Sequence, residues 1–254
     1  MVVMPWHYPR LIAHRCGGAL APENTLAGLE IAARLGVKAV EFDVMLSADG
    51  VPLLIHDETL ERTTTGTGAV ADQTAAALRL LDAGRRHHPA FAGERIPTFQ
   101  EALAYCARLG LAANVEIKPA TGHEVATGQA VAEALLAWFH DEQARYAHAP
   151  PLLFSSFSQP ALVAANQAGV AAAGLPCALL FEDVPAGWQD CLHDSGCRFL
   201  HCDAARLDVR RLAEIHAAGV TLACYTVNSD TQAQRLYASG VAAVFSDRPD
   251  LLMK

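Results

Sequence analysis

Short runs of apolar residues alternate with amphipathic, helix-like segments along nearly the whole chain. Eight of these runs have the length and the branched or aromatic content of buried strands. They span residues 11–15, 39–44, 111–118, 151–157, 177–182, 198–203, 221–228 and 242–247. Several segments between them begin at Thr, Ser or Asp and end at Gly, as helices commonly do. The predicted helices cover 23–36, 98–110, 125–140, 159–169, 208–219 and 229–240.

This rotation of strand, helix and glycine is typical of parallel β/α units, and eight is the strand number of a TIM (β/α)8 barrel. Periodicity alone leaves an open, doubly wound sheet as an alternative. No strand is followed by the GxGxxG or GxxxxGK pattern of nucleotide-binding open sheets, which favours the closed barrel. We predict a single barrel domain over residues 1–254, with a polar, Thr/Gly-rich insertion at about 57–95 after the second strand.

Composition narrows the class of protein. The chain has 254 residues, 52% of them hydrophobic, and a net charge of -8, which argues against wrapping nucleic acid. Its seven cysteines lack CxxC spacing, so we expect reduced thiols. Residues 1–10 lack the pattern of a secretion signal, and no apolar run has the length of a membrane span. We therefore expect a soluble, cytoplasmic protein. Homodimers are common among soluble enzymes, and on that basis alone we expect a homodimer.

Polar side chains interrupt two of the predicted strands. Glu41 and Asp43 lie two positions apart and so project to one face, and Glu116 and Lys118 repeat this spacing in a later strand. Three carboxylates converging inside a barrel repel one another, and a divalent cation would neutralise them. An all-oxygen set suits Mg²⁺ or Ca²⁺ better than zinc. The alternative is a buried salt bridge between Lys118 and one of the acids.

Histidines end two other apolar runs. His14 is followed by Arg15, and His56 by Asp57, which either orients the histidine or begins a turn. A lone histidine at such a position is more often structural, but two at comparable strand ends form an acid/base pair with pKa values near neutrality. Arg15 and Lys118 would supply the positive charge that a phosphodiester needs.

The order and spacing of these motifs resemble one known family. The stretch from HRCGGALAPENT to HDETLERTTTGTG, with NVEIKPA, LLFSSFSQPAL, LACYTVNS and AAVFSDRPDLL, is similar to the glycerophosphodiester phosphodiesterase family, in particular its cytosolic bacterial type. The similarity covers nearly the whole chain. It implies a β/α barrel with a segment inserted after the second strand, and one divalent cation, Mg²⁺ or Ca²⁺.

The resemblance also implies roles for individual residues. It makes His14 and His56 the catalytic histidines, Arg15 and Lys118 the phosphate-binding pair, and Glu41, Asp43 and Glu116 the metal ligands. Tyr225 stands where many relatives carry Trp and would form an aromatic substrate-binding wall. Glu23 and Asn24 belong to the PENT motif, which we interpret mainly as a helix start. Cys16 replaces a usual Gly, so a positive φ there would strain the loop.

The activity that the resemblance implies is metal-dependent hydrolysis of glycerophosphodiesters, such as glycerophosphocholine or glycerophosphoethanolamine, to sn-glycerol 3-phosphate and an alcohol. The two histidines would act as general acid and base, with their individual roles left open. Attack by water and attack by a glycerol hydroxyl, which gives a cyclic phosphate, both remain alternatives. So do a lysophospholipase D, a phosphoinositide-type phospholipase C and a barrel that only binds phosphorylated ligands.

His201 would either line the pocket or pack in the core.

Overall fold

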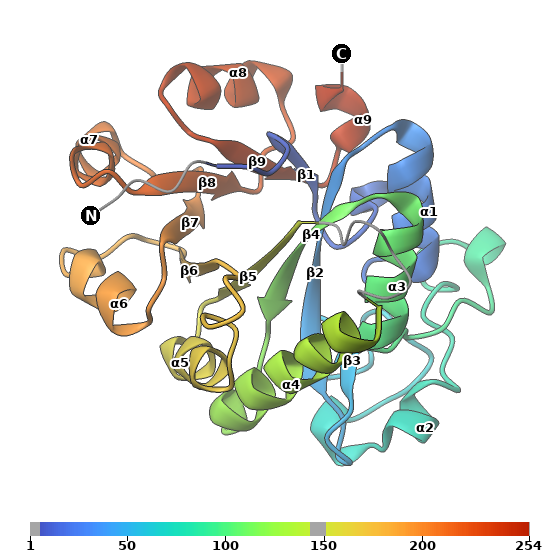
Figure 1. Cartoon of the computed structure of the whole chain (residues 1–254). Helices are drawn as coiled ribbons and strands as arrows, with labels where there is room; N and C mark the ends of the chain where they lie inside the picture. The colour runs from blue at the N-terminus through green and yellow to red at the C-terminus, as the bar shows by residue number, and fades with distance from the viewer. Residues whose placement is uncertain (1–5, 143–150, 254) are drawn as a thin grey trace.

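The computed structural model describes residues 6–142 and 151–253. Residues 1–5, which begin the segment tested above for a secretion signal, lie outside the described residues. Eight parallel strands form the centre of the molecule (Figure 1). They are β1 (Leu11–Ala13), β2 (Ala39–Leu46), β4 (Ala112–Ile117), β5 (Leu152–Ser156), β6 (Cys177–Phe181), β7 (Phe199–Asp203), β8 (Thr221–Tyr225) and β9 (Ala243–Ser246). Each coincides with one of the predicted strands.

The sheet closes on itself. The strands follow the order β1, β9, β8, β7, β6, β5, β4 and β2, and β1 also pairs with β2 in parallel through Ala13 and Val40. This closing pair confirms the TIM barrel and excludes the open sheet, which leaves two free edges. All eight residues of β2 are buried.

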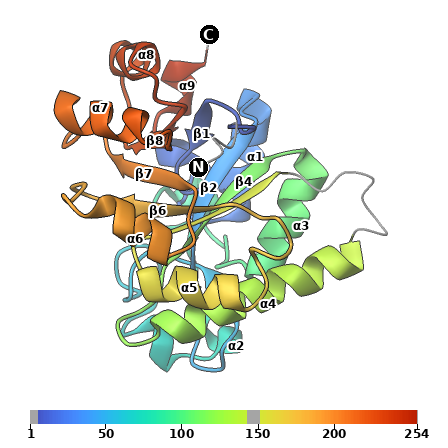
Figure 2. The ribbon, with the colours of Figure 1, turned by 60° about the vertical axis from the view of Figure 1, so that its left-hand side comes forward.

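The helices form the outer layer of the barrel (Figure 2). The longer ones are α1 (Leu26–Leu35), α3 (Phe99–Leu109), α4 (Glu124–Glu142), α5 (Gln159–Gln167), α6 (Trp188–Asp194), α7 (Val209–Ala217) and α8 (Asp230–Ala238); α9 (Pro249–Leu252) is a single turn. Local sequence sets their ends. Thr98 and Glu101 form a reciprocal capping box at the start of α3, and Gly36, with φ of 90°, ends α1 in the left-handed conformation. No helix in the described ranges has both the length and the apolarity to cross a membrane.

Of the elements that were not predicted, two carry little local signal in the sequence. The first is β3 (Pro52–Leu54), which pairs antiparallel with the end of β2. It lies on the edge of β2 opposite β4, which β1 leaves free beyond its single paired position at Val40. The second is α6, which is short and begins at Gly187 without a side-chain cap. Neither element carries the periodicity or the cap on which the sequence prediction relied.

The segment at 57–95 follows β3 and covers one side of the barrel (Figure 1). It contains α2 (Ala75–Leu78) and two 3-10 helices, Val70–Asp72 and Pro89–Phe91. Leu60, Val70 and Leu78 are almost fully buried in a small hydrophobic cluster that also contains Met45 of β2 and Leu53 of β3. The segment is therefore folded onto the barrel by apolar packing, despite its polar composition.

The N-terminal segment closes the end of the barrel at which the strands begin. The Trp6 ring meets the Phe199 ring edge-on, with centroids 5.3 Å apart, and Tyr8 donates a hydrogen bond to the Leu152 carbonyl over 2.7 Å. Phe199 and Leu152 are the first residues of their strands. The packed end thus lies at the strand starts, which leaves the strand ends for the functional groups.

Two adjacent non-glycine residues directly after β1 have a positive φ and strain the loop. Arg15 has φ of 48° and Cys16 has φ of 74°, and the Cys16 side chain is fully buried. The condition under which Cys16 would strain the loop, a positive φ, is therefore met. Gly28 of α1 makes room for this residue, because a β-carbon on Gly28 would lie 2.8 Å from the Cys16 β-carbon and 3.0 Å from the Gly17 nitrogen.

We predict that Gly28→Ala destabilises the protein, although it lies inside a helix. Helix propensity favours Ala by about 1 kcal/mol, whereas overpacking costs about 1–3 kcal/mol. Urea denaturation should show a net loss of unfolding free energy, partly recovered when Cys16→Gly removes the closer of the two contacts. A Gly28→Ala protein more stable than wild type would show that the loop moves aside freely.

Candidate active site

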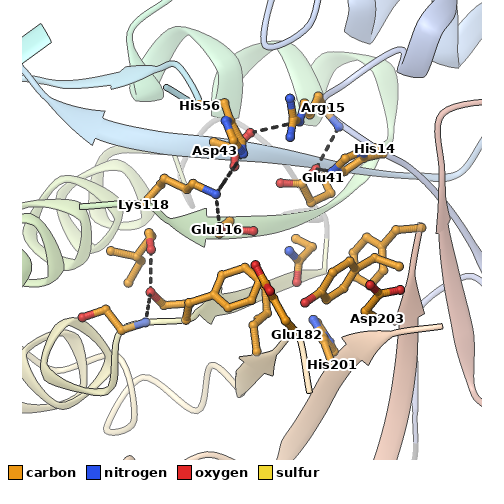
Figure 3. A pocket seen from close by; sticks show the side chains of 18 of the residues that line it. His14, Arg15, Glu41, Asp43, His56, Glu116, Lys118, Glu182, His201 and Asp203 are labelled. Carbon is orange, nitrogen blue, oxygen red and sulfur yellow. Dashed lines mark hydrogen bonds and ion pairs between the residues drawn. The ribbon is translucent and has the colours of Figure 1, made fainter. Parts of the chain in front are cut away.

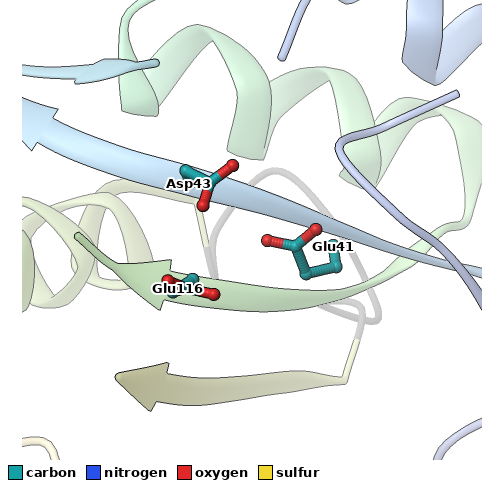
Figure 4. A group of neighbouring side chains, drawn as sticks. All are labelled: Glu41, Asp43 and Glu116. Carbon is teal, nitrogen blue, oxygen red and sulfur yellow. The ribbon is translucent and has the colours of Figure 1, made fainter. Parts of the chain in front are cut away.

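The register between β2 and β4 brings the three predicted acidic residues together. Glu41 lies opposite Asn114, and Asp43 lies opposite Glu116, so their side chains share the barrel interior. Each of the three acids offers a carboxylate oxygen within 4.8 Å of the oxygens of the other two (Figure 4). Their exposed fractions are 3% for Glu41, 1% for Asp43 and 7% for Glu116.

Burial makes this carboxylate cluster resist full ionisation. Burial, and then the negative charge of Asp43, raise the pKa of Glu41 to about 8 and that of Glu116 to about 7. Burial also opposes ionisation of Asp43, but neighbouring positive groups, led by His56, outweigh it and lower the pKa of that carboxyl. Glu41 Oε1 is buried and has no hydrogen-bond partner among the described residues. An all-oxygen set with an unpartnered carboxylate oxygen fits a divalent cation.

Lys118 also reaches this carboxylate cluster. Its Nζ lies 3.1 Å from Glu116 Oε1 and 3.8 Å from Asp43 Oδ1. Burial opposes protonation of the amine, but the two carboxylates outweigh burial and raise the pKa of Lys118. The buried salt bridge weighed above is therefore present. It contacts two of the acids and leaves Glu41 without a contact to this ammonium, so it does not replace a cation.

His14 stands at the end of β1, where Asp247 holds its ring. Nδ1 lies 2.7 Å from Asp247 Oδ1, and Nε2 lies 3.8 Å from Glu41 Oε2. Burial opposes protonation of the ring, but the Asp247 hydrogen bond and the Glu41 charge raise the pKa of His14. Asp247 is held in turn by Asn228, whose Oδ1 accepts the Asp247 backbone N–H over 2.8 Å.

Asp247 was missed as a site residue. In the sequence, Asp247 stands only within the family motif AAVFSDRPDLL, and it lies 233 positions from His14. The signal that could have found it was its place directly after a barrel strand, where functional side chains gather.

His56 follows β3, and its neighbour Asp57 orients it. Nδ1 lies 2.6 Å from Asp57 Oδ1, and Nε2 lies 2.9 Å from Lys118 Nζ. Of the two interpretations of Asp57, orientation of the histidine is the one that the geometry supports. Burial, together with the charge of Lys118, lowers the pKa of His56.

Arg15 and the PENT motif meet beside the cluster. Arg15 donates its backbone N–H to Glu41 Oε2 over 2.8 Å and its Nη1 contacts Glu23 Oε1 at 3.1 Å. Asn24, with φ of 56°, donates Nδ2–H to Asp43 Oδ2 over 2.8 Å. The interpretation of PENT as mainly a helix start was incomplete. Thr25 provides the cap of α1, while Glu23 and Asn24 turn toward site residues.

The three carboxylates, the two histidines, Arg15 and Lys118 line a cavity of about 790 Å³ at the carboxyl ends of the strands (Figure 3). Across it from the carboxylates lie Glu182 and Asp203, at the ends of β6 and β7. Tyr225 and Phe157 add an aromatic wall, with ring centroids 5.9 Å apart. The Tyr225 hydroxyl donates to the Phe181 carbonyl over 2.8 Å, so its ring is held in place.

His201 and Cys16, two further residues considered from the sequence, are both buried. His201 is fully buried between Trp6 and Phe245 at the pocket floor, and neither ring nitrogen has a hydrogen-bond partner among the described residues. Burial lowers its pKa to about 3, so the ring stays neutral. Burial also raises the pKa of the Cys16 thiol well above its ordinary value, which makes this cysteine a poor nucleophile.

The fold and this geometry define a class of protein: a TIM-barrel enzyme whose strand ends gather acids, histidines and basic groups suited to a phosphate ester. Residues 14–251 match the glycerophosphoryl diester phosphodiesterase family. The chain belongs to this family of phosphoric diester hydrolases, as the sequence motifs predicted.

Relatives span almost the full chain. A glycerophosphodiester phosphodiesterase of Caldanaerobacter subterraneus is 30% identical over 244 residues, covering 96% of each chain. One from Bacillus subtilis is 30% identical over 260 residues, covering 96% of this chain and 85% of the relative. The structure of an Oleispira antarctica phosphodiesterase in complex with the product sn-glycerol-3-phosphate is 38% identical, with a TM-score of 0.87 and coverage of 96% and 95%.

We predict that cation affinity rises with pH. In the cation-free protein Glu41 and Glu116 hold protons up to about pH 8 and about pH 7, and a bound cation must displace them. The dissociation constant for Mg²⁺ or Ca²⁺ should therefore fall at least about tenfold between about pH 6 and about pH 8. Calorimetry in buffers of different ionisation enthalpy would count the released protons, and Glu41→Gln should reduce that count. A flat affinity profile would contradict the shifts.

Proposed function

We propose that the protein hydrolyses glycerophosphodiesters in this cavity, releasing sn-glycerol 3-phosphate and an alcohol. The observation that carries the proposal is the pair of histidines at the carboxylate cluster, each held at Nδ1 by its own aspartate, Asp247 for His14 and Asp57 for His56. The product bound to the Oleispira antarctica phosphodiesterase supports the substrate class.

The histidines would transfer the protons of the reaction. A carboxylate that accepts a hydrogen bond from Nδ1–H keeps the proton of a neutral ring on Nδ1. The lone pair then lies on Nε2, the atom that acts as base. One histidine takes the proton of the attacking hydroxyl, either water or the neighbouring glycerol hydroxyl. The other, protonated, gives its proton to the departing alkoxide. His14 and His56 fill these two roles.

The phosphoryl group would lie between the carboxylates and the basic side chains. Arg15 and Lys118 attract its oxygens and stabilise the charge that develops on them. Glu41, Asp43 and Glu116 would hold one Mg²⁺ or Ca²⁺, which supplies Lewis-acid polarisation of the phosphoryl oxygen when bound. The lysine would then exchange part of its contact with Glu116 for the substrate.

We predict that chelation abolishes release of sn-glycerol 3-phosphate from glycerophosphocholine and that Mg²⁺ or Ca²⁺ restores it. His14→Ala and His56→Ala should each lower kcat by about 10²–10⁴-fold, the usual contribution of a general acid or base. A coupled assay for the product measures both effects.

His193→Ala is the matched control, because this histidine is largely exposed on α6 and should change nothing. Lysophosphatidylcholine should be a poor substrate beside glycerophosphocholine. Folded protein that releases no product with either cation, or that keeps its rate without both histidines, would contradict the proposal.

The far wall of the cavity supports a cationic leaving alcohol, such as choline or ethanolamine. Glu182 and Asp203 face the pocket beside the rings of Tyr225 and Phe157. Arg206 lies 3.4 Å from Glu182 Oε2 and 3.7 Å from Asp203 Oδ2, so one guanidinium offsets two carboxylates and leaves a net negative charge. Acids and aromatic faces together attract ammonium groups.

We predict that Glu182→Gln combined with Asp203→Asn raises KM for glycerophosphocholine about tenfold, corresponding to roughly 1.4 kcal/mol of lost attraction. The KM for glycerophosphoglycerol, whose leaving alcohol is neutral, should change little. Steady-state kinetics on the two substrates gives the comparison. Equal changes for both would show that this wall does not select the head-group charge.

A further inference from the structure

Arg62 lies early in the 57–95 segment and binds two carboxylates from different parts of the chain. Its Nη1 and Nη2 lie 2.7 and 2.8 Å from the Oε2 and Oε1 atoms of Glu23. Its Nε and Nη2 lie 2.5 and 2.9 Å from the Oδ2 and Oδ1 atoms of Asp57. One guanidinium therefore makes paired hydrogen bonds to two acids, a geometry that the planar fork of arginine allows and lysine does not.

Each of these carboxylates holds a residue of the proposed machinery. Asp57 Oδ1 lies 2.6 Å from His56 Nδ1, and Glu23 Oε1 lies 3.1 Å from Arg15 Nη1. The chain of contacts runs from His56 through Asp57, Arg62 and Glu23 to Arg15. It joins the loop after β3 to the loop after β1, and its central link belongs to the 57–95 segment.

Arg62 binds both carboxylate oxygens of each acid, and this is how it affects the groups that the acids hold. Both oxygens of Asp57 and both of Glu23 bond to Arg62. A carboxylate held at both oxygens has a fixed plane, so the group that bonds to it has a fixed direction. The hydrogen bonds of Arg62 also lower the pKa of Asp57 and keep it an acceptor for the Nδ1 proton. Without Arg62, each acid would keep a single described side-chain partner and could rotate.

A contribution to stability must be separated from a role in the site. The Arg62 side chain is 47% exposed, and an exposed ion pair contributes little to folding, although paired arginine–carboxylate contacts contribute more. Arg79 is a suitable comparison, because it lies in the same segment, is 46% exposed and pairs with Glu101 at a distance from the site. Arg79 pairs with one carboxylate and Arg62 with two, and the two partners of Arg62 contact His56 and Arg15.

We propose that Arg62 is a positioning residue, which aligns His56 and Arg15 by fixing the two carboxylates that hold them. The 57–95 segment then contributes to the active site by supplying this arginine. This inference rests on the proposed function for its kinetic consequences, whereas its structural consequence stands apart from turnover.

The kinetic test compares Arg62→Ala, Arg62→Lys and the control Arg79→Ala. Arg62→Ala should lower kcat for glycerophosphocholine by about 10–100-fold, the usual effect of losing a partner that orients a site residue. Arg62→Lys should stay well below wild type, because an ammonium cannot grip both acids. Cation affinity and melting temperature should match those of Arg79→Ala. Added guanidinium chloride, at tens of millimolar by order of magnitude, should restore part of the rate of Arg62→Ala. It should not raise the rate of wild type or of Arg79→Ala.

A second measurement reports on His56 without turnover. Two-bond ¹H–¹⁵N spectra of histidine-labelled protein distinguish the ring tautomers, with His56→Gln assigning the signal. Wild type should hold the neutral His56 ring with its proton on Nδ1, and Arg62→Ala should shift it toward a mixture, unlike Arg79→Ala. An inactive wild type with this tautomer shift would overturn the proposed substrate and keep the positioning role. An unchanged tautomer, or a kcat within about twofold of Arg79→Ala, would overturn the positioning role.

Discussion

Mutual repulsion among three buried carboxylates is the constraint around which this barrel is organised. Glu41, Asp43 and Glu116 lie in register on two neighbouring strands, in a place that most barrels fill with branched apolar side chains. Their charges are expensive to bury, and the pKa values of the two glutamates are raised accordingly. The fold tolerates this because the rest of the core is extensive and apolar. The site is thus a local exception that the surrounding structure supports.

Positive groups reach the acids from several separate segments. Lys118 comes from the end of β4, Arg15 from the loop after β1 and Arg62 from the 57–95 segment. The first two lie close to the acids, and the third lies one carboxylate further out. Positive and negative groups therefore alternate in layers around the cavity, so a movement of one group alters the electrostatic environment of the next. This layering explains why polar loops, rather than the apolar core, carry so much of the site.

Sequence patterns predicted the barrel and much of the candidate site because both depend on local periodicity. A spacing of two along a strand placed Glu41 beside Asp43, and an apolar run placed His14 at a strand end. The missing parts depend on distant contacts. The pairing of His14 with Asp247 requires knowledge of which strands are neighbours, and β3 lies on an edge of β2 that β1 leaves free. Periodicity within one segment contains neither kind of information.

The hydrogen bond between His14 and Asp247 joins the first strand of the barrel to the residue after its last. During synthesis on the ribosome, His14 emerges long before its partner, which lies 233 positions later in the chain. A polypeptide interrupted before Asp247 would contain both histidines and all three acids, yet its first histidine would lack the carboxylate that orients it. The geometry of this site therefore becomes complete only after the last strand of the barrel has been synthesised.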